Sequence, residues 1–405
     1  MQKTGSRAAS GVWPLWIHEE KSMARFTAIA FLLLAPVAAP DAFAQKGEAP
    51  IQIFGYFQNS LQHWSTFEGR SEQNSFSLQQ LNLMLQKDLR RDWTAFINFE
   101  ILNNFSSTRK WGALNLEEAW VRYRAGKRLK LKLGLLVPTF NNLNEDKNRT
   151  PILPYVIRPL VYETSFNEFI GIENFLPTRA FAQVYGFFPY NEVKVDYAVY
   201  LGNSPNVNND PEAGQTGIDT TTTFLIGGRL GIRHGELKLG LSYTYDEDNQ
   251  FQEIADTLGR PPEDLKELPR KRLGGDLSYN YSRFSFESEF ISSGIDPDLP
   301  ELEVDVDFYY ATLSYNFTEQ LLFYGSYWIA KSRLSVLAPD DEMVEKEEIL
   351  TPNAGVSYDL DERIRLKVHY ARVKADEHRR FITEDRIEVE EDNFSVYSAA
   401  VSVFF

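Results

Sequence analysis

Pairs of basic residues two positions apart are the residues of this sequence with the clearest chemical potential. Among these pairs are Arg122/Arg124, Lys130/Lys132 and Arg365/Lys367. Residues i and i+2 of a β-strand point to the same face, so each pair would set two positive charges side by side. Fixed cations on the wall of a water-filled passage attract anions and repel cations. The expected chemistry is electrostatic selection of solutes.

Acidic residues at strand spacing form a second group. Asp276, Glu287 and Glu289 lie in two later segments, and in a closed ring of about 16 strands these would stand roughly opposite the first two basic pairs. Interior charges stay ionised only when they are paired or hydrated. The hypothesis is a basic wall facing an acidic wall across a wet lumen. The alternative left open is that these charges pair across strands and have no role in selectivity.

Short segments in which apolar and polar residues alternate must position these charges. One example is Val193–Leu201, in which Val, Tyr and Leu alternate with Lys, Asp, Ala and Tyr. Period two puts one set of side chains on each face of a strand. Sixteen candidate strands centre near Phe54, Leu83, Ile97, Val121, Leu133, Val184, Tyr197, Gly227, Leu241, Leu277, Phe286, Tyr310, Phe323, Val356, Val368 and Val401.

The connections between these segments alternate in length. Seven are short, at 87–92, 125–128, 189–192, 234–236, 281–283, 317–320 and 359–363. Between them lie long polar loops, among them 246–271, 331–348 and 374–393. Short turns on one side and long loops on the other are typical of outer-membrane barrels. The sequence therefore predicts an all-β fold, a closed antiparallel transmembrane β-barrel of about 16 strands.

Both ends of the chain are consistent with export to the outer membrane. An apolar stretch follows Arg25 and ends at an A-x-A site closing with Ala44, the order of a secretory signal. We expect residues 1–44 to be a signal peptide with its true start at Met23, and 45–405 to be the barrel. The last segment alternates apolar residues up to Phe405, like the final strand of outer-membrane proteins.

The longest connection runs from Pro138 to Thr178 and is the third long loop. A span of this length usually has a function. It carries many aromatic side chains, which need a surface to pack on, and we expect that surface to be the inside of the barrel wall. Its charged residues expected to line a constriction are Arg149, Arg158, Glu163 and Glu168.

The sequence around this loop resembles the porin O/P-like family, which includes phosphate-selective members. The resemblance rests on four stretches: Glu118–Tyr123, Lys132–Pro138, Arg158 and Asn174–Phe181. Individual sequence motifs match over residues 118–186. Over the whole of 51–405 the resemblance is only in the general pattern of a barrel. It implies a homotrimer of 16-stranded barrels, a third loop folded into the lumen, and passive diffusion of small hydrophilic solutes or inorganic anions. No phosphate-binding set of Arg and Lys residues is matched.

Other chemistry has little support in the sequence. The chain has no cysteine and only 5 histidines, and its net charge of −15 argues against a nucleic-acid partner. No nucleotide, metalloprotease or serine-hydrolase motif occurs, so no cofactor, metal or catalytic residue is expected. Acidic runs at 246–248, 340–342 and 388–392 are expected in solvated loops; alternatively they bind divalent cations that bridge to lipopolysaccharide. The alternatives to a channel are a closed structural or adhesive barrel and, less favoured, a barrel hydrolase.

Overall fold

The structure, a computed structural model, describes residues 50–66, 71–102, 113–146, 150–162, 175–204, 223–248, 268–295, 302–337, 342–381 and 386–405. The expected signal peptide lies outside these residues. The strands are β1 (Gln52–Trp64), β2 (Gln73–Arg90), β3 (Trp93–Leu102), β4 (Ala113–Arg124), β5 (Lys130–Leu136), β6 (Ala180–Tyr190), β7 (Val193–Gly202), β8 (Leu225–His234), β9 (Leu237–Asp248), β10 (Leu268–Tyr281), β11 (Phe284–Ile295), β12 (Leu302–Asn316), β13 (Leu321–Leu337), β14 (Glu342–Asp359), β15 (Ile364–Phe381) and β16 (Arg386–Phe404).

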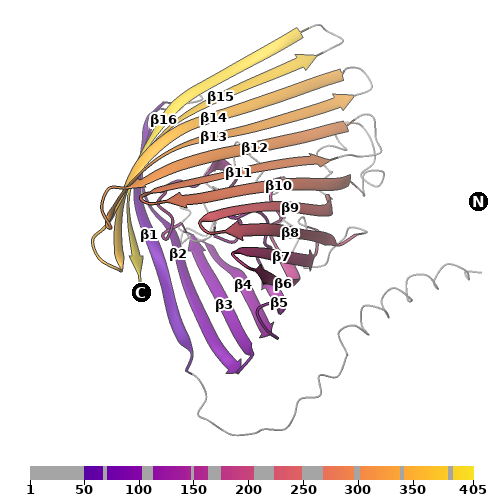
Figure 1. Cartoon of the computed structure of the whole chain (residues 1–405). Coiled ribbons are helices and arrows are strands. Elements are labelled where there is room, and N and C mark those ends of the chain that lie inside the picture. Colours follow the sequence, from indigo (N-terminus) through magenta and orange to yellow (C-terminus); the bar gives the residue numbers. More distant parts are fainter. Residues whose placement is uncertain are drawn as a thin grey trace, which may run out of the picture. The chain divides into compact units, whose positions relative to one another are not determined.

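These 16 strands pair in sequence order and close into one antiparallel barrel (Figure 1). The first and last strands complete the ring, with Tyr56 opposite Phe404. Gly55 and Phe405 exchange both backbone hydrogen bonds, at 2.9 and 3.0 Å, so the terminal aromatic residue is part of the closure. The predicted fold class is confirmed, and every predicted strand centre falls inside one of the observed strands.

The short connections are found where the sequence predicts them, whereas several predicted loops are in fact strand. β13, β14, β15 and β16 extend through most of 331–348 and 374–393. Charges occupy both faces there, and cross-strand ion pairs such as Lys331–Glu348, at 3.1 Å, link the strands. Beyond the lipid layer neither face needs apolar residues, so the period-two apolar signal disappears although the strand continues.

The two faces of the barrel differ in chemistry. The outer face exposes large apolar residues, such as Leu241 at 66% and Val368 at 60%. The inner face carries polar side chains that bond across strands; Gln80 donates to Glu100 at 2.7 Å, and Asn82 donates to Asn98 at 3.0 Å. No helix among the described residues is long and apolar enough to cross a membrane.

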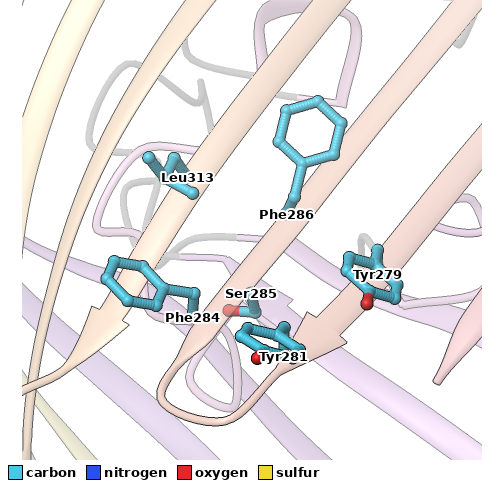
Figure 2. A pocket seen from close by; sticks show the side chains of 6 residues that line it. All are labelled: Tyr279, Tyr281, Phe284, Ser285, Phe286 and Leu313. Carbon is cyan, nitrogen blue, oxygen red and sulfur yellow. The ribbon is translucent and has the colours of Figure 1, made fainter.

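Aromatic side chains gather on the outer face beside the short turn between β10 and β11 (Figure 2). Tyr279 and Tyr281 stack with ring centroids 6.4 Å apart, and Phe284 packs against Tyr315 at 4.8 Å. Tyr279, Tyr281, Phe284, Phe286 and Leu313 line an apolar depression on the outer surface. Tyrosine and phenylalanine are characteristic of the level at which a membrane meets water. This band therefore marks the turn-side boundary of the lipid layer.

Candidate functional site: the lumen and the third loop

The loop between β5 and β6, residues 137–179 (the third loop), folds against the inner face of the barrel. Its described parts contribute Phe140, Leu143, Ile157, Leu160, Val161, Tyr162, Phe175 and Leu176 to an apolar cluster. The wall contributes Ile291, Val306, Phe308, Tyr310, Trp328, Ala330, Ile349, Val373, Phe394 and Val396. Burying one large apolar side chain stabilises a fold by about 1.5–3 kcal/mol. A cluster of this size fixes the loop inside the barrel.

Glu289 of β11 holds the first part of the loop. One carboxylate oxygen accepts the backbone N–H groups of Asn142 and Leu143, at 2.9 and 2.7 Å. The other accepts the hydroxyl of Tyr162, in the short 3₁₀ helix η2 (Leu160–Tyr162), at 2.5 Å. Burial, followed by the charge of Glu289, raises the pKa of Tyr162 well above its usual range, so this hydroxyl remains a donor. Glu289 therefore joins two parts of the loop to the wall.

A glycine lets the loop approach the wall beside this carboxylate. A Cβ atom at Gly274 of β10 would lie 2.2 Å from Oδ1 of Asn141, so any larger residue there would require the Asn141 side chain to shift. Asn141 adopts φ 51°, its backbone N–H donates to Ser242 at 2.8 Å, and its side-chain amide donates to the carbonyl of Phe290 at 3.1 Å.

Lys367 and Arg365 of β15 hold the middle of the loop. The Lys367 ammonium donates to the carbonyl oxygens of Thr150 and Tyr155, at 2.9 and 3.1 Å, and to Gln58 at 2.8 Å. Arg365 donates to the carbonyl of Ile152 at 2.6 Å. Here a cation satisfies backbone acceptors that have left regular secondary structure.

The buried positions of Lys367 and Glu289 correct the expectation that they line the open lumen. Lys367 is 1% exposed and Glu289 is 3% exposed. Both point inward, as their strand parity requires, but the loop covers them. The odd or even position of a residue along a strand tells which face its side chain is on. It cannot show what packs on that face. Glu287, two residues from Glu289 on the same face, is half-buried.

Basic residues remain on the opposite side of the lumen, next to the turn between β4 and β5. Arg122 stands directly across from Lys132, and Arg124 directly across from Lys130. We call these four residues the basic block. Arg124 is exposed, and the other three are half-buried. The structure thus brings together the four cations that the sequence places on strands four and five.

Aromatic rings lie between the cations of the basic block. The Lys132 ammonium lies 5.0 Å from the ring centre of Trp120 and 5.4 Å from that of Tyr185. Lys130 lies 5.2 Å from Tyr185, and Arg122 lies 5.8 Å from Trp120. Ring faces carry partial negative charge and attract cations. The rings therefore hold the basic side chains without cancelling their charge.

An acid of the third loop approaches this block. Glu145 lies 3.5 Å from the Lys132 ammonium. Arg158 of the loop is buried and acts electrostatically on Glu100 of β3. The expected constriction residues Arg149, Glu163 and Glu168 lie outside the described residues.

A further row of cations continues the basic surface. Lys194 of β7 stands across from Arg233 of β8, which stands across from Lys238 of β9. We call these three residues the cation row. Arg233 also donates to Asp196 at 2.9 Å. Lys194, Arg233 and Lys238 each lie an even number of residues from a buried inner-face residue of the same strand, namely Ala198, Arg229 and Ser242, so all three face inward. The sequence already contained this signal.

Among the described residues, the acids Asp276 and Glu289 do not form the expected open acidic wall. Asp276 is buried and receives two hydrogen bonds from Arg229 of β8, at 2.9 and 2.6 Å, and Glu289 is covered by the loop. Asp246, expected in a solvated loop, lies in β9 and is fully buried, 3.0 Å from Arg272 and 3.1 Å from Arg270. These acids serve cross-strand pairing and loop anchoring, because buried carboxylates need paired cations or donors.

The apolar inner face of β11–β16 is the other feature that sequence reasoning missed. Two runs show its signature, Phe308-Tyr309-Tyr310 and Tyr327-Trp328-Ile329, in which alternation is lost. A strand whose two faces are both apolar is covered on both. Lipid covers the outer face, and the third loop covers the inner one.

A closed 16-stranded barrel with an apolar outer face, a polar lumen and a loop folded inside defines a channel-forming protein of the bacterial outer membrane. The model of the Gram-negative porin family matches residues 27–378. The chain therefore belongs to the Gram-negative porin family, and it is an outer-membrane porin.

Solved structures share this fold at low sequence identity. The anion-selective porin from Comamonas acidovorans is 13% identical, with a TM-score of 0.57, covering 88% of this chain and 99% of that one. A loop L8 deletion mutant of OmpT from Vibrio cholerae is 11% identical in sequence, with a TM-score of 0.56. The match covers 88% of this chain and 99% of that one. OmpF of Salmonella typhi in complex with daunomycin is 11% identical, with a TM-score of 0.54. The match covers 88% of this chain and 97% of that one. A search of curated proteins found no match.

Proposed function

We propose that this porin is a passive channel that favours small anions. The observation that carries the proposal is the basic block, in which cations stand directly across from cations on β4 and β5. Like charges in this position destabilise a sheet. A passing anion relieves that repulsion, and it gains attraction from several cations at once. The anion selectivity named for the Comamonas acidovorans relative is consistent with this proposal.

The third loop is proposed to set the width of the pore. Sixteen strands enclose an aqueous channel, and a segment anchored on its wall reduces the free cross-section. Glu145 of the loop and Lys132 of the wall lie 3.5 Å apart, so loop and basic block meet at this point. Solutes would pass between them in a field set by both signs of charge.

Reversal potentials in a salt gradient test the anion preference. Replacing Arg122 and Lys132 by glutamate should shift the reversal potential of planar-bilayer currents toward cations. The control replaces Lys331 and Lys346, which lie on the outer face of β13 and β14, by glutamate with the same change in net charge. Equal shifts in both variants would contradict the proposal. A protein that inserts but passes no current would instead favour the closed structural barrel.

We also propose that the mature protein is a homotrimer. One structural neighbour, OmpT of Vibrio cholerae, is described in a trimer form, at 10% identity and a TM-score of 0.50. Asn59 supports a protein neighbour, since it is exposed on the outer face near the middle of β1, where a polar amide in lipid is unfavourable. Native mass spectrometry of detergent-extracted protein should give three chains; monomers alone would contradict it.

Lipopolysaccharide is the proposed partner of the outer rim. Lys331, Arg333, Lys346 and His378 line an outward-facing groove beyond the lipid layer, together with acidic neighbours. The cations suit lipid phosphates, and the acids suit bridging divalent ions. Thermal stability in lipopolysaccharide-containing vesicles should exceed that in phospholipid vesicles, and Lys331→Gln with Lys346→Gln should remove the difference. An unchanged difference would argue against this surface.

A further inference from the structure

The inner face of β14, β15 and β16 carries a row of glutamates near the loop ends of these strands. Odd-numbered residues of β14 and β15 and even-numbered residues of β16 face inward, as buried Ile349, Val373 and Phe394 show. On the same face, Glu347 stands directly across from Glu377, and Glu377 directly across from Glu390. We call these three residues the glutamate row.

The surroundings of the glutamate row are also acidic. In the described loop-end part of this inner face, six carboxylates stand against two guanidinium groups. The carboxylates are those of Glu345, Glu347, Glu377, Glu388, Glu390 and Asp392, and the guanidinium groups those of Arg379 and Arg386. Arg379 lies 2.5 Å from Glu377 and 3.4 Å from Glu345, so the row is only partly neutralised. The described inner face of these three strands therefore keeps a net negative charge near the loop ends.

The opposite end of the lumen carries the opposite charge. The cation row and the basic block lie beside the short turns at 125–129, 191–192 and 235–236, at the turn ends of β4, β5, β7, β8 and β9. The glutamate row instead lies near the opposite ends of β14, β15 and β16, beside the connections at 338–341 and 382–385. Glu377 is 13 residues from the start of β15 at Ile364, which in a tilted strand is roughly 30 Å along the barrel axis. The pore thus carries two charged zones of opposite sign in series.

We propose that this pore rectifies ion current, passing more when the loop side is positive than when it is negative. The inference rests on the proposed function, since it requires a conducting lumen. Short turns face the periplasm in outer-membrane barrels, so the loop side is extracellular. The preferred direction of current is therefore from outside to inside.

The direction follows from which ions each zone admits. The acidic zone concentrates cations and the basic zone concentrates anions. When the loop side is positive, cations enter through the acidic zone and anions through the basic zone, so both accumulate in the pore and conductance rises. When the polarity is reversed, each ion must first cross the zone that repels it, and the middle of the pore is depleted of carriers.

Salt concentration sets the size of the effect. The Debye length is about 10 Å at 0.1 M and about 3 Å at 1 M salt. Fixed charges on the wall therefore control the lumen in dilute salt and are screened in concentrated salt. We expect a ratio of currents at opposite voltages of about two at 0.1 M, falling to about one at 1 M.

Current–voltage curves in planar bilayers test this proposal, with orientation fixed by labelling. The chain has no cysteine, so Glu319→Cys in the turn after β12 can be labelled with a polyethylene-glycol maleimide too large for the pore, which reacts from the turn side alone. Replacing Glu347, Glu377 and Glu390 by glutamine should bring the current ratio toward one at 0.1 M.

A matched control lies on the same three strands. Glu348, Asp376 and Glu391 are the immediate neighbours of the row and face outward. Replacing them by Gln, Asn and Gln removes the same charge and should leave the ratio unchanged. A linear curve for the unmodified channel at 0.1 M, or equal effects of both triple variants, would overturn the proposal while leaving the conducting pore intact. Absence of any current would overturn the proposed function, and the inference with it.

Discussion

The two sides of the barrel wall have opposite kinds of inner surface. On β11–β16 the middle of the inner face is apolar and lies beneath the third loop. On β4–β9 the inner face near the turns is basic and remains accessible to solvent at Arg124, Lys194 and Arg233. Both are built from the same alternating strands. The comparison shows that strand pattern fixes the face of a side chain, while the loop decides whether that face becomes core or pore.

Removing the loop should produce the largest effect. Deleting Asn141–Asn167 would uncover the apolar wall and widen the lumen, so single-channel conductance should rise severalfold. Trimer formation, checked by native mass spectrometry, is the control for folding. Unchanged conductance in folded trimers would leave the constriction proposal without support.

A core residue of the covered wall should matter far more than its outward neighbour. Trp328 is fully buried against the loop-facing cluster and donates to Ser326 at 2.7 Å. Trp328→Ala should lower the free energy of unfolding in lipid vesicles by about 3–5 kcal/mol, because it leaves a large cavity. Tyr327→Ala, on the lipid-facing side, should cost much less. Similar losses from both would mean that the loop adds little to the wall.

Loosening one anchor should have a smaller effect that is specific to the loop. Glu289→Gln should weaken three hydrogen bonds and cost about 2 kcal/mol in unfolding free energy. It should also raise the current noise of single channels, since the loop then fluctuates. The matched change is Glu303→Gln, on the exposed outer face of the adjacent strand β12. If noise rises equally in both variants, the loop is not held by Glu289.

The smallest expected effect is a pH dependence of rectification. Glu347 lies beyond the lipid layer, since its outward neighbours Lys346 and Glu348 are charged. Burial, followed by the charges of Glu377 and Glu345, raises the pKa of Glu347 to about 7. Ser332 of β13 donates to it, and Arg379 of β15 lies beside Glu345 and Glu377.

The sign follows from this pKa. At pH 8 Glu347 is mostly ionised and at pH 6 mostly protonated, so the acidic zone weakens as pH falls. The current ratio at 0.1 M salt should therefore be lower at pH 6 than at pH 8. Glu347→Gln should flatten this dependence, and Glu348→Gln should preserve it. A ratio that rises on acidification would contradict the assignment of Glu347 to the acidic zone.

The sequence by itself determined the barrel. Alternation, seven short connections and a terminal aromatic predicted the strands, the turn side and the closing end, because these are local signals with a period of two. Parity also placed Arg122, Arg124, Lys130 and Lys132 on the inner face. The loop ends of the long strands were missed because, beyond the lipid layer, both faces are charged and the apolar period is lost.

Only the tertiary structure decided what the inward residues do. Glu289 and Lys367 have the same parity as wet pore residues, yet the third loop buries them and uses them as anchors. Asp276 pairs with Arg229 on β8, so it forms no acidic wall. These outcomes depend on where a long loop packs and on contacts between residues more than 40 positions apart. Such contacts are set by shape and by the satisfaction of buried groups, which no local period encodes.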